Sequence, residues 1–410
     1  MRPCGRRSWP STRAASGAWA HLQRLRLADA TTARRASLNH VLTLSPYTES
    51  APYTESAPYT ESAPYTESAP VSGYAQAGRG GRQPVAFVGR PPQRTEPKGR
   101  RPVVAVLDSG CGRHPWLDTL VHTVVRVAGQ RIGLDPTAGP EFFPDTVGPL
   151  DGALDAYAGH GTFSAGLVHL AAPDADIVAW RILPAEGAMV EQDLIDALDD
   201  VAELVRRHRD GDPDAVGVDI VSLSVGYYHE TPEDALFDSP LWCSLQALLA
   251  LGVTVVCAAG NDATARPRFP AAFDPWEPGH PCPVDWGGAP LAPLVAVGAL
   301  NPNNTDALFS NVGPWVRAHA SGAAVLSTMP VSFEGGLQAS AATTAHGRRR
   351  ASIDPDDYSS GFSIWSGTSF AAPLLAGQLA AELADPAVLP DDPVKRARTV
   401  VERVTGLVPQ

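Results

Sequence analysis

The sequence predicts an α/β fold, in which the buried strands of one sheet alternate with helices that cover it. Residues 103–107 and 253–259 are continuous apolar runs rich in β-branched side chains, which is typical of strands buried on both faces. Residues 190–208 instead carry apolar side chains at helical spacing, so strand and helix patterns alternate along the chain. Further buried strands are predicted at residues 176–183, 219–224 and 294–299.

The first strand, at residues 103–107, leads directly into Asp108, Ser109 and Gly110. Functional groups collect at the carboxyl ends of strands in open α/β sheets, so this position favours a chemical role for Asp108. A single aspartate beside glycine is more often a turn former, which is the alternative at this point.

His160 lies between Gly159 and Gly161 at the start of a predicted helix of small and apolar residues. The two glycines let other backbone segments approach the imidazole closely. Taken alone, such a histidine is more often a hydrogen-bonded core residue than a catalytic base.

Asn261 and Ser369 complete the set of candidate residues. Asn261 follows the strand at 253–259, where its amide can donate to a developing oxyanion, although asparagine is also common in turns. Ser369 lies in the run 367–373, at the first turn of a predicted helix, where N–H groups and the helix dipole favour negative charge. A serine there is also a common helix cap.

In the order Asp, His, Asn and Ser, these segments resemble the subtilisin-like serine peptidases, or subtilases, over roughly residues 101–385. His160 follows Asp108 by 52 residues and Ser369 follows His160 by 209, which agrees with that family. The resemblance implies a three-layer, doubly wound, mostly parallel sheet flanked by helices. It also implies a serine endopeptidase, with a catalytically silent, peptide-binding pseudopeptidase as the alternative that four intact residues argue against.

The resemblance assigns a role to each of the four residues. Asp108 orients His160, and His160 takes the proton from Ser369, which attacks the scissile carbonyl and forms an acyl-enzyme. Asn261 and the backbone N–H of Ser369 hold the oxyanion. No cofactor or metal is expected for catalysis. A structural calcium ion is possible without identifiable ligands. The acidic cluster of Asp354, Asp356 and Asp357 in a predicted surface loop at 331–362 could hold calcium, but the pattern favours a solvated, charge-rich loop over a calcium site.

By the same resemblance, Ser224, Val225 and Gly226 form the exposed edge that pairs with the substrate backbone. The family commonly has a second glycine where this chain has Tyr227, so the tyrosine either narrows a subsite or packs over the strand.

Three further departures from the family lie beside the catalytic residues. Phe163 and Ser164 replace a histidine and a valine, and we expect them to alter helix packing and leave the chemistry intact. Phe370 replaces a methionine, so we expect tolerance of peroxide, because phenylalanine forms no sulfoxide.

Residues 1–100 predict a disordered, basic extension ahead of a peptidase domain at residues 101–410. The hexapeptide Pro-Tyr-Thr-Glu-Ser-Ala occurs four times over residues 46–69, and proline in every unit prevents a regular helix or a central strand. No signal-peptide pattern is found, which favours the cytoplasm, with secretion as the alternative if translation begins elsewhere. No prodomain pattern is found either, so either the peptidase folds without a prodomain or translation begins elsewhere.

The charge of the chain is unevenly distributed. Residues 1–100 hold 14 Lys+Arg against 6 Asp+Glu, whereas the remainder holds 18 against 38, and the whole chain has a net charge of −12. An acidic enzyme domain argues against nucleic-acid binding, and no apolar stretch has transmembrane length. We therefore expect a monomer whose partner is a polypeptide substrate, with no nucleic acid and no membrane. The five cysteines match no zinc pattern.

Overall fold

The computed structural model describes most of the chain beyond residue 75 and three short parts before it. The hexapeptide repeat at 46–69 lies outside the described residues. The described residues are 17–28, 37–44, 74, 76–97, 99–230, 239–280, 282–288, 290–385 and 389–408.

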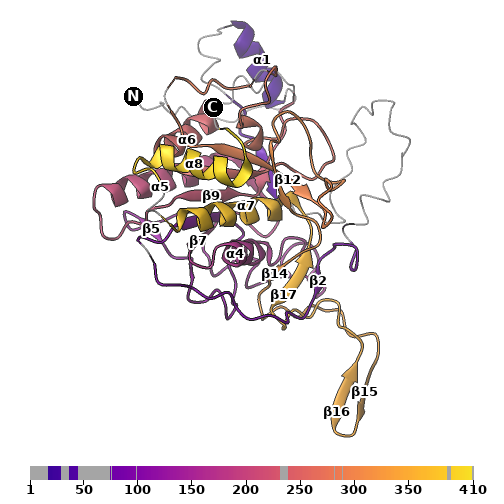
Figure 1. Cartoon of the computed structure of the whole chain (residues 1–410). Coiled ribbons are helices and arrows are strands. Elements are labelled where there is room, and N and C mark those ends of the chain that lie inside the picture. Colours follow the sequence, from indigo (N-terminus) through magenta and orange to yellow (C-terminus); the bar gives the residue numbers. More distant parts are fainter. Residues whose placement is uncertain are drawn as a thin grey trace.

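A seven-stranded sheet forms the centre of the molecule (Figure 1). Every neighbouring pair of its strands is parallel, which confirms the α/β class that the buried apolar runs predict. In spatial order the strands are β13 (Ala318–Ser321), β12 (Leu294–Leu300), β11 (Thr254–Ala258), β9 (Ile220–Leu223), β3 (Val103–Asp108), β7 (Asp176–Arg181) and β4 (Val121–His122).

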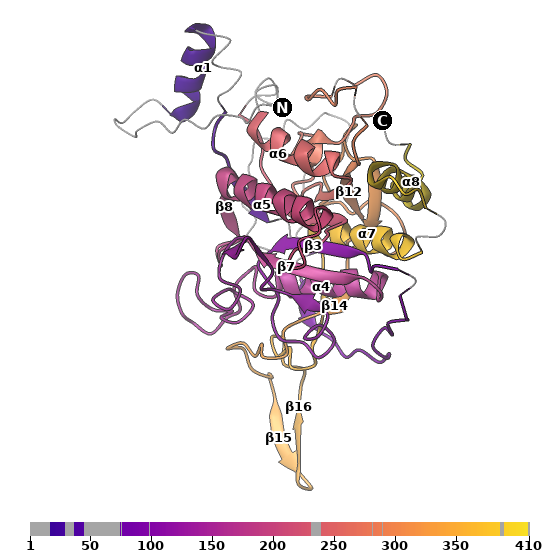
Figure 2. The ribbon, with the colours of Figure 1, turned by 90° about the vertical axis from the view of Figure 1, so that its left-hand side faces the viewer.

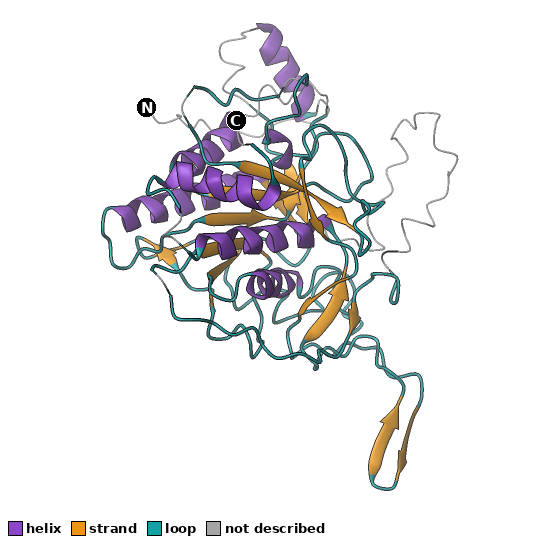
Figure 3. Cartoon of the chain, in the orientation of Figure 1, coloured by secondary structure: helices purple, strands orange, loops and turns teal. Residues whose placement is uncertain are grey.

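Helices cover both faces of this sheet and complete three layers (Figure 3). Because side chains alternate along a strand, Ala105 and Leu107 of β3 join one apolar cluster while Val104 and Val106 join the other. The first cluster includes α5 (Glu191–Arg209) and α6 (Ser239–Ala250). The second includes α4 (His160–Ala171), α7 (Thr368–Leu383) and α8 (Pro393–Thr405).

Smaller sheets and short elements lie around the central layers. One sheet joins β10 (Val225–Gly226), β1 (Val41–Leu44) and β8 (Ala188–Val190), and another joins β14 (Val325–Thr328), β17 (Phe362–Trp365) and β2 (Gln83–Pro84). The two-stranded ribbons are β5 (Arg126–Val127) with β6 (Gln130–Arg131), and β15 (Ala342–Ala345) with β16 (Arg348–Ala351). The remaining elements are α1 (Ala18–Ala28) and the 3-10 turn η3 (Ala271–Phe273).

Two expectations need correction. The extension at 1–100 is not wholly disordered, because it contributes α1 and the strands β1 and β2, both of which pair with strands of the region beyond residue 100. The segment at 331–362 is more than a surface loop, because β15 and β16 form a ribbon that projects from the body of the molecule (Figures 1 and 2). In both segments, pairing between strands produces the regular structure that the sequence pattern did not predict.

No helix in the described part of the chain combines the length and apolarity needed to cross a bilayer. Cys111 and Cys257 are buried thiols whose pKa values are raised by burial.

Candidate active site

Asp108 and His160 meet at the carboxyl edge of the central sheet. Asp108 is the last residue of β3, and His160 is the first residue of α4. Nδ1 of His160 lies 2.7 Å from Oδ1 of Asp108, and both side chains are buried. Because a carboxylate only accepts, this hydrogen bond places the Nδ1 proton toward Asp108 and leaves Nε2 as the basic nitrogen.

The backbone around this pair is tightly packed. A side chain at position 161 would collide with the carbonyl of Gly110, so only glycine fits after His160. The N–H of Ser109 donates to Oδ1 of Asp108 at 2.7 Å, and the hydroxyl of Ser164 donates to Oδ2 at 3.3 Å. Ser164 therefore contributes more than the altered helix packing expected from sequence, because its hydroxyl contacts the carboxylate that holds His160.

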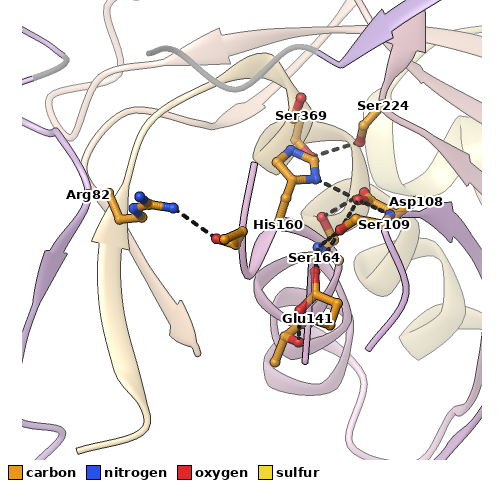
Figure 4. A network of polar contacts seen from close by, with 11 residues as sticks. Arg82, Asp108, Ser109, Glu141, His160, Ser164, Ser224 and Ser369 are labelled. Atoms are coloured by element: carbon orange, nitrogen blue, oxygen red, sulfur yellow. Dashed lines mark hydrogen bonds and ion pairs between the residues drawn. The ribbon is translucent and has the colours of Figure 1, made fainter. Parts of the chain in front are cut away.

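Ser369 is the second residue of α7 and lies beside the edge of His160 that carries Nε2 (Figure 4). Within the described part of the chain, neither Nε2 of His160 nor Oγ of Ser369 has a hydrogen-bond partner, although both atoms are buried. The main-chain carbonyl of Ser369 accepts a hydrogen bond from Ser224 at 3.1 Å. The structure thus brings together Asp108, His160 and Ser369.

Asn261 lies just beyond β11 and is held by the residue that precedes Ser369. Its Oδ1 accepts from both the N–H and the hydroxyl of Thr368, each at 2.9 Å, and the same hydroxyl accepts from the N–H of Gly260 at 3.0 Å. A backbone N–H can only donate, so the atom facing Thr368 must be the amide oxygen. The NH₂ group of Asn261 is therefore the end of the amide that is directed away from Thr368.

Aromatic side chains pack around His160. Phe370 lies 5.1 Å from the imidazole and Trp365 lies 5.9 Å from it, measured between ring centroids. Phe163 packs on Phe370 at 4.5 Å, so this departure from the family pattern does serve packing.

Glu141 is a buried carboxyl group that sequence reasoning missed. It accepts hydrogen bonds from the hydroxyl of Ser109 at 2.6 Å, from the N–H of Gly161 at 3.0 Å, and from the hydroxyl of Thr162. Burial raises the pKa of Glu141 to about 7, against the opposing effect of these hydrogen bonds. Through Ser109 and Gly161, Glu141 connects the two segments that carry Asp108 and His160 (Figure 4).

Arg82 is a second residue without a local sequence signal. Its guanidinium donates to the carbonyls of Leu154, Asp155 and Ala158 at 2.9–3.1 Å, and it lies 5.0 Å from the ring centre of Trp365. These carbonyls belong to the loop that leads into His160, so a residue of the N-terminal extension helps to position the imidazole.

The edge formed by Ser224, Val225 and Gly226 already has a strand beside it. β1 pairs antiparallel with β10, with Leu44 opposite Val225 and Thr43 opposite Gly226, and pairs with β8 on its other side. The guanidinium of Arg268 donates to the carbonyl of Thr43 at 2.7 Å and to that of Gly226 at 3.1 Å. The exposed edge expected from sequence is therefore covered by residues of the same chain.

Tyr227 is buried and packs against neighbouring side chains. It is 4% exposed, its ring stacks on His40 with centroids 4.2 Å apart, and its hydroxyl donates to Glu191 at 3.4 Å. Of the two alternatives for this residue, the structure favours the one in which Tyr227 covers the strand.

Carboxylates of the acidic cluster at 354–357 accept hydrogen bonds from backbone N–H groups of the segment at 331–362. The carboxylate of Asp356 accepts from the N–H of Leu337 at 3.0 Å, and that of Asp357 accepts from the N–H of Ser359 at 2.9 Å. These bonds are typical of turns and give no support to a calcium site.

Comparisons with known proteins identify the family of the chain. A family model described as the subtilase family matches residues 99–396. The intracellular serine protease of Paenibacillus polymyxa is 27% identical over 307 residues, which cover 72% of this chain and 71% of that protein. The major intracellular serine protease of Bacillus subtilis is 26% identical, over 61% of this chain and 66% of that protein. The crystal structure of a cold adapted subtilisin-like serine proteinase is also similar, at 20% identity and a TM-score of 0.44. The match covers 72% of this chain and 79% of that protein's chain.

The family match and these serine protease relatives define a serine-type endopeptidase. Because the family model matches well over half of the sequence, the chain belongs to the subtilase family.

Proposed function

We propose that this subtilase hydrolyses peptide bonds through a triad of Asp108, His160 and Ser369. The observation that carries the proposal is the 2.7 Å hydrogen bond between His160 and Asp108, at a buried position beside Ser369 (Figure 4). A structural histidine would not require a carboxylate on one nitrogen and a helix-start serine at the edge of the other.

The steps follow from the atoms that face one another. Nε2 of His160 removes the hydroxyl proton of Ser369 as Oγ attacks the scissile carbonyl, and Asp108 stabilises the imidazolium that forms. The amide of Asn261 and the N–H of Ser369 donate to the oxyanion at the start of α7. His160 then protonates the leaving amine, and water releases the acyl group from Ser369 by the reverse sequence.

The substrate backbone binds, in this proposal, along Ser224, Val225 and Gly226. The support comes from β1, which already makes antiparallel strand contacts there. A polypeptide substrate must therefore displace β1 before it reaches Ser369, and the resting chain is partly self-blocked. The boundary between an extension at 1–100 and a peptidase domain at 101–410 is part of the same proposal, with β1 and β2 as the extension's contributions to the domain.

The setting of the enzyme remains a proposal as well. Two relatives are named as intracellular proteases, which supports the cytoplasm as the location. Monomeric action on polypeptides, without nucleic acid or membrane partners, stays a prediction.

A fluorophosphonate probe tests the triad directly, because it labels only an activated serine. We expect labelling of Ser369 in the full chain, and loss of the label in Ser369→Ala and His160→Ala. Ser340→Ala, which alters an exposed serine next to the projecting ribbon, serves as the labelled control. A folded wild-type protein that takes up no label would support the pseudopeptidase alternative and refute the proposal.

A further inference from the structure

A cluster of metal-ligating side chains lies outside the catalytic set, next to the start of β1. His40, His229 and Glu230 each contribute one ligand atom, and these three atoms all lie within 4.8 Å of one another. Both imidazoles are buried, whereas Glu230 is exposed. His40 immediately precedes β1, and the other two residues follow β10. The cluster therefore joins the N-terminal extension to the rim of the proposed substrate edge.

Glu191 fixes the orientation of His40. Its Oε2 lies 2.9 Å from Nδ1 of His40 and also accepts the N–H of His40 at 3.2 Å. Since the carboxylate only accepts, Nδ1 carries the proton and the lone pair belongs to Nε2. Nε2 lies 3.8 Å from Oε2 of Glu230. A carboxylate behind a histidine, with the opposite nitrogen toward the other ligands, is the arrangement that metal-binding histidines commonly adopt.

Aromatic packing holds both imidazoles in place. The ring of His40 stacks on Tyr227, with centroids 4.2 Å apart and planes 13° apart. The ring of His229 meets Phe269 at 4.6 Å and His40 at 4.9 Å. Packing alone accounts for two buried rings, but it does not account for a carboxylate on each side of His40.

We propose that His40, His229 and Glu230 bind one divalent transition-metal ion, with Zn²⁺ as the best match. Two imidazoles and one carboxylate form a ligand set that suits Zn²⁺, with the fourth position left to water. Ligands about 2.1 Å from a tetrahedral ion are roughly 3.4 Å apart, so atoms that now lie within 4.8 Å of one another must close by at most about 1.4 Å. For Nε2 of His40 and Oε2 of Glu230, which are 3.8 Å apart, the movement is about 0.4 Å, and the Glu230 side chain is exposed.

The ion would act as a clasp for β1. It would tie His40, at the start of that strand, to the two residues that follow β10, its hydrogen-bonded neighbour. Metal binding would therefore favour the state in which the substrate edge is covered. The effect on peptidase activity rests on the proposed function, whereas metal binding itself does not.

Metal binding is tested on the full chain, stripped with a chelator and then freed of it. Zn²⁺ is titrated by competition with a chromophoric chelator, and Co²⁺ is added separately to record its visible spectrum. We expect one high-affinity ion per chain, with a tetrahedral Co²⁺ spectrum. Glu230→Gln and His229→Ala should each weaken Zn²⁺ binding at least 10-fold, and Glu191→Gln about 10- to 100-fold.

The exposed histidine His122 provides the control, because His122→Ala should bind Zn²⁺ as the wild type does. Glu230→Gln alters an exposed side chain, so its result stands even if His229→Ala fails to fold. Equal Zn²⁺ affinity in wild type and Glu230→Gln, or no ion bound at all, would overturn the proposal.

The clasp is tested in Ser369→Ala, so that its outcome does not depend on catalysis. The N–H of Leu44 donates to the carbonyl of Gly187 at 3.1 Å, and its hydrogen exchange reports whether β1 is docked. We expect Zn²⁺ to slow this exchange at least 10-fold, and to leave it unchanged in the double variant with Glu230→Gln. Zn²⁺ that binds at the cluster without slowing the exchange would refute the clasp.

Discussion

At the scale of single residues, Glu141 is a buried carboxyl group that accepts hydrogen bonds from three donors near Asp108 and His160. Burial raises its pKa from 4.5 to about 7, so between these pH values the folded protein binds a proton that the unfolded chain does not. The free energy of unfolding should therefore fall as pH rises through this window. The fall amounts to about 3 kcal/mol for the shift involved.

Glu141→Gln removes this pH dependence, because glutamine does not titrate. The measurement is urea unfolding at pH 4.5, 6 and 7.5, with Ser369→Ala in both proteins to prevent self-digestion. The stability of the Glu141 protein should drop with rising pH relative to that of Glu141→Gln. Parallel pH curves for the two proteins would show that Glu141 keeps an ordinary pKa.

Phe370 sets the response to oxidants. The residue is fully buried beside His160, and phenylalanine cannot be converted to a sulfoxide. We expect the wild type to retain most of its peptidase activity under peroxide that inactivates Phe370→Met within the same time. Residual activity and the mass of the peptide at 370 are both measured; equal inactivation of the two proteins would contradict the prediction.

The four catalytic candidates could be predicted from sequence because each lies within a short motif at the end of an element. Asp108 closes a strand, and Ser369 opens a helix, so local pattern places them. Glu141 and Arg82 lie in segments without strand or helix periodicity. They reach the site through contacts with residues 20 to 76 positions away, and the local sequence pattern does not predict contacts over such distances.

At the scale of elements, β1 is the strand with the clearest functional consequence. Its side chains alternate, with Leu42 and Leu44 buried and Val41 and Thr43 exposed. Backbone pairing to β10 and β8 thus combines with burial of two leucines to hold the strand beside the proposed substrate edge.

Leu42→Asp should release this strand and raise peptidase activity, because an unpaired carboxylate would replace a side chain with 0% exposure. We expect a lower KM for a peptide substrate, with kcat changed little. Val41→Asp is the matched control, since this neighbouring side chain is 59% exposed and the variant should behave as wild type. An unchanged KM in Leu42→Asp would mean that β1 does not compete with substrate.

Sequence pattern predicted the long buried strands and helices of the central layers, where apolar periodicity is strong over many residues. It did not predict β1 or β2, which are four and two residues long. Strands this short exist only because a partner edge is available, and β2 pairs with residues about 280 positions away, which leaves no local pattern in the sequence.

At the scale of the whole molecule, the ribbon of β15 and β16 projects from the body and is almost entirely exposed. β15 and β16 pair with each other, and seven of their eight residues are exposed (Figure 2). The ribbon therefore contributes little to the buried core of the fold.

Replacement of residues 342–351 by a short glycine-serine linker should change the free energy of unfolding by less than about 1 kcal/mol. Fluorophosphonate labelling of Ser369 should also be unchanged. Denaturant unfolding and labelling rate are compared with the intact chain. A large loss of stability would show that the ribbon packs on the body in solution.

Arg82 has a consequence for how far the amino terminus can be trimmed. Its guanidinium braces the loop before His160, and β2, directly after it, completes a sheet with β17. Proteolytic maturation that removes β1 and still yields a competent enzyme must therefore cut after residue 44 and before residue 82. The hexapeptide repeat at 46–69 falls wholly inside this interval, where a cut would free the edge of β10 and keep Arg82 and β2 attached to the domain.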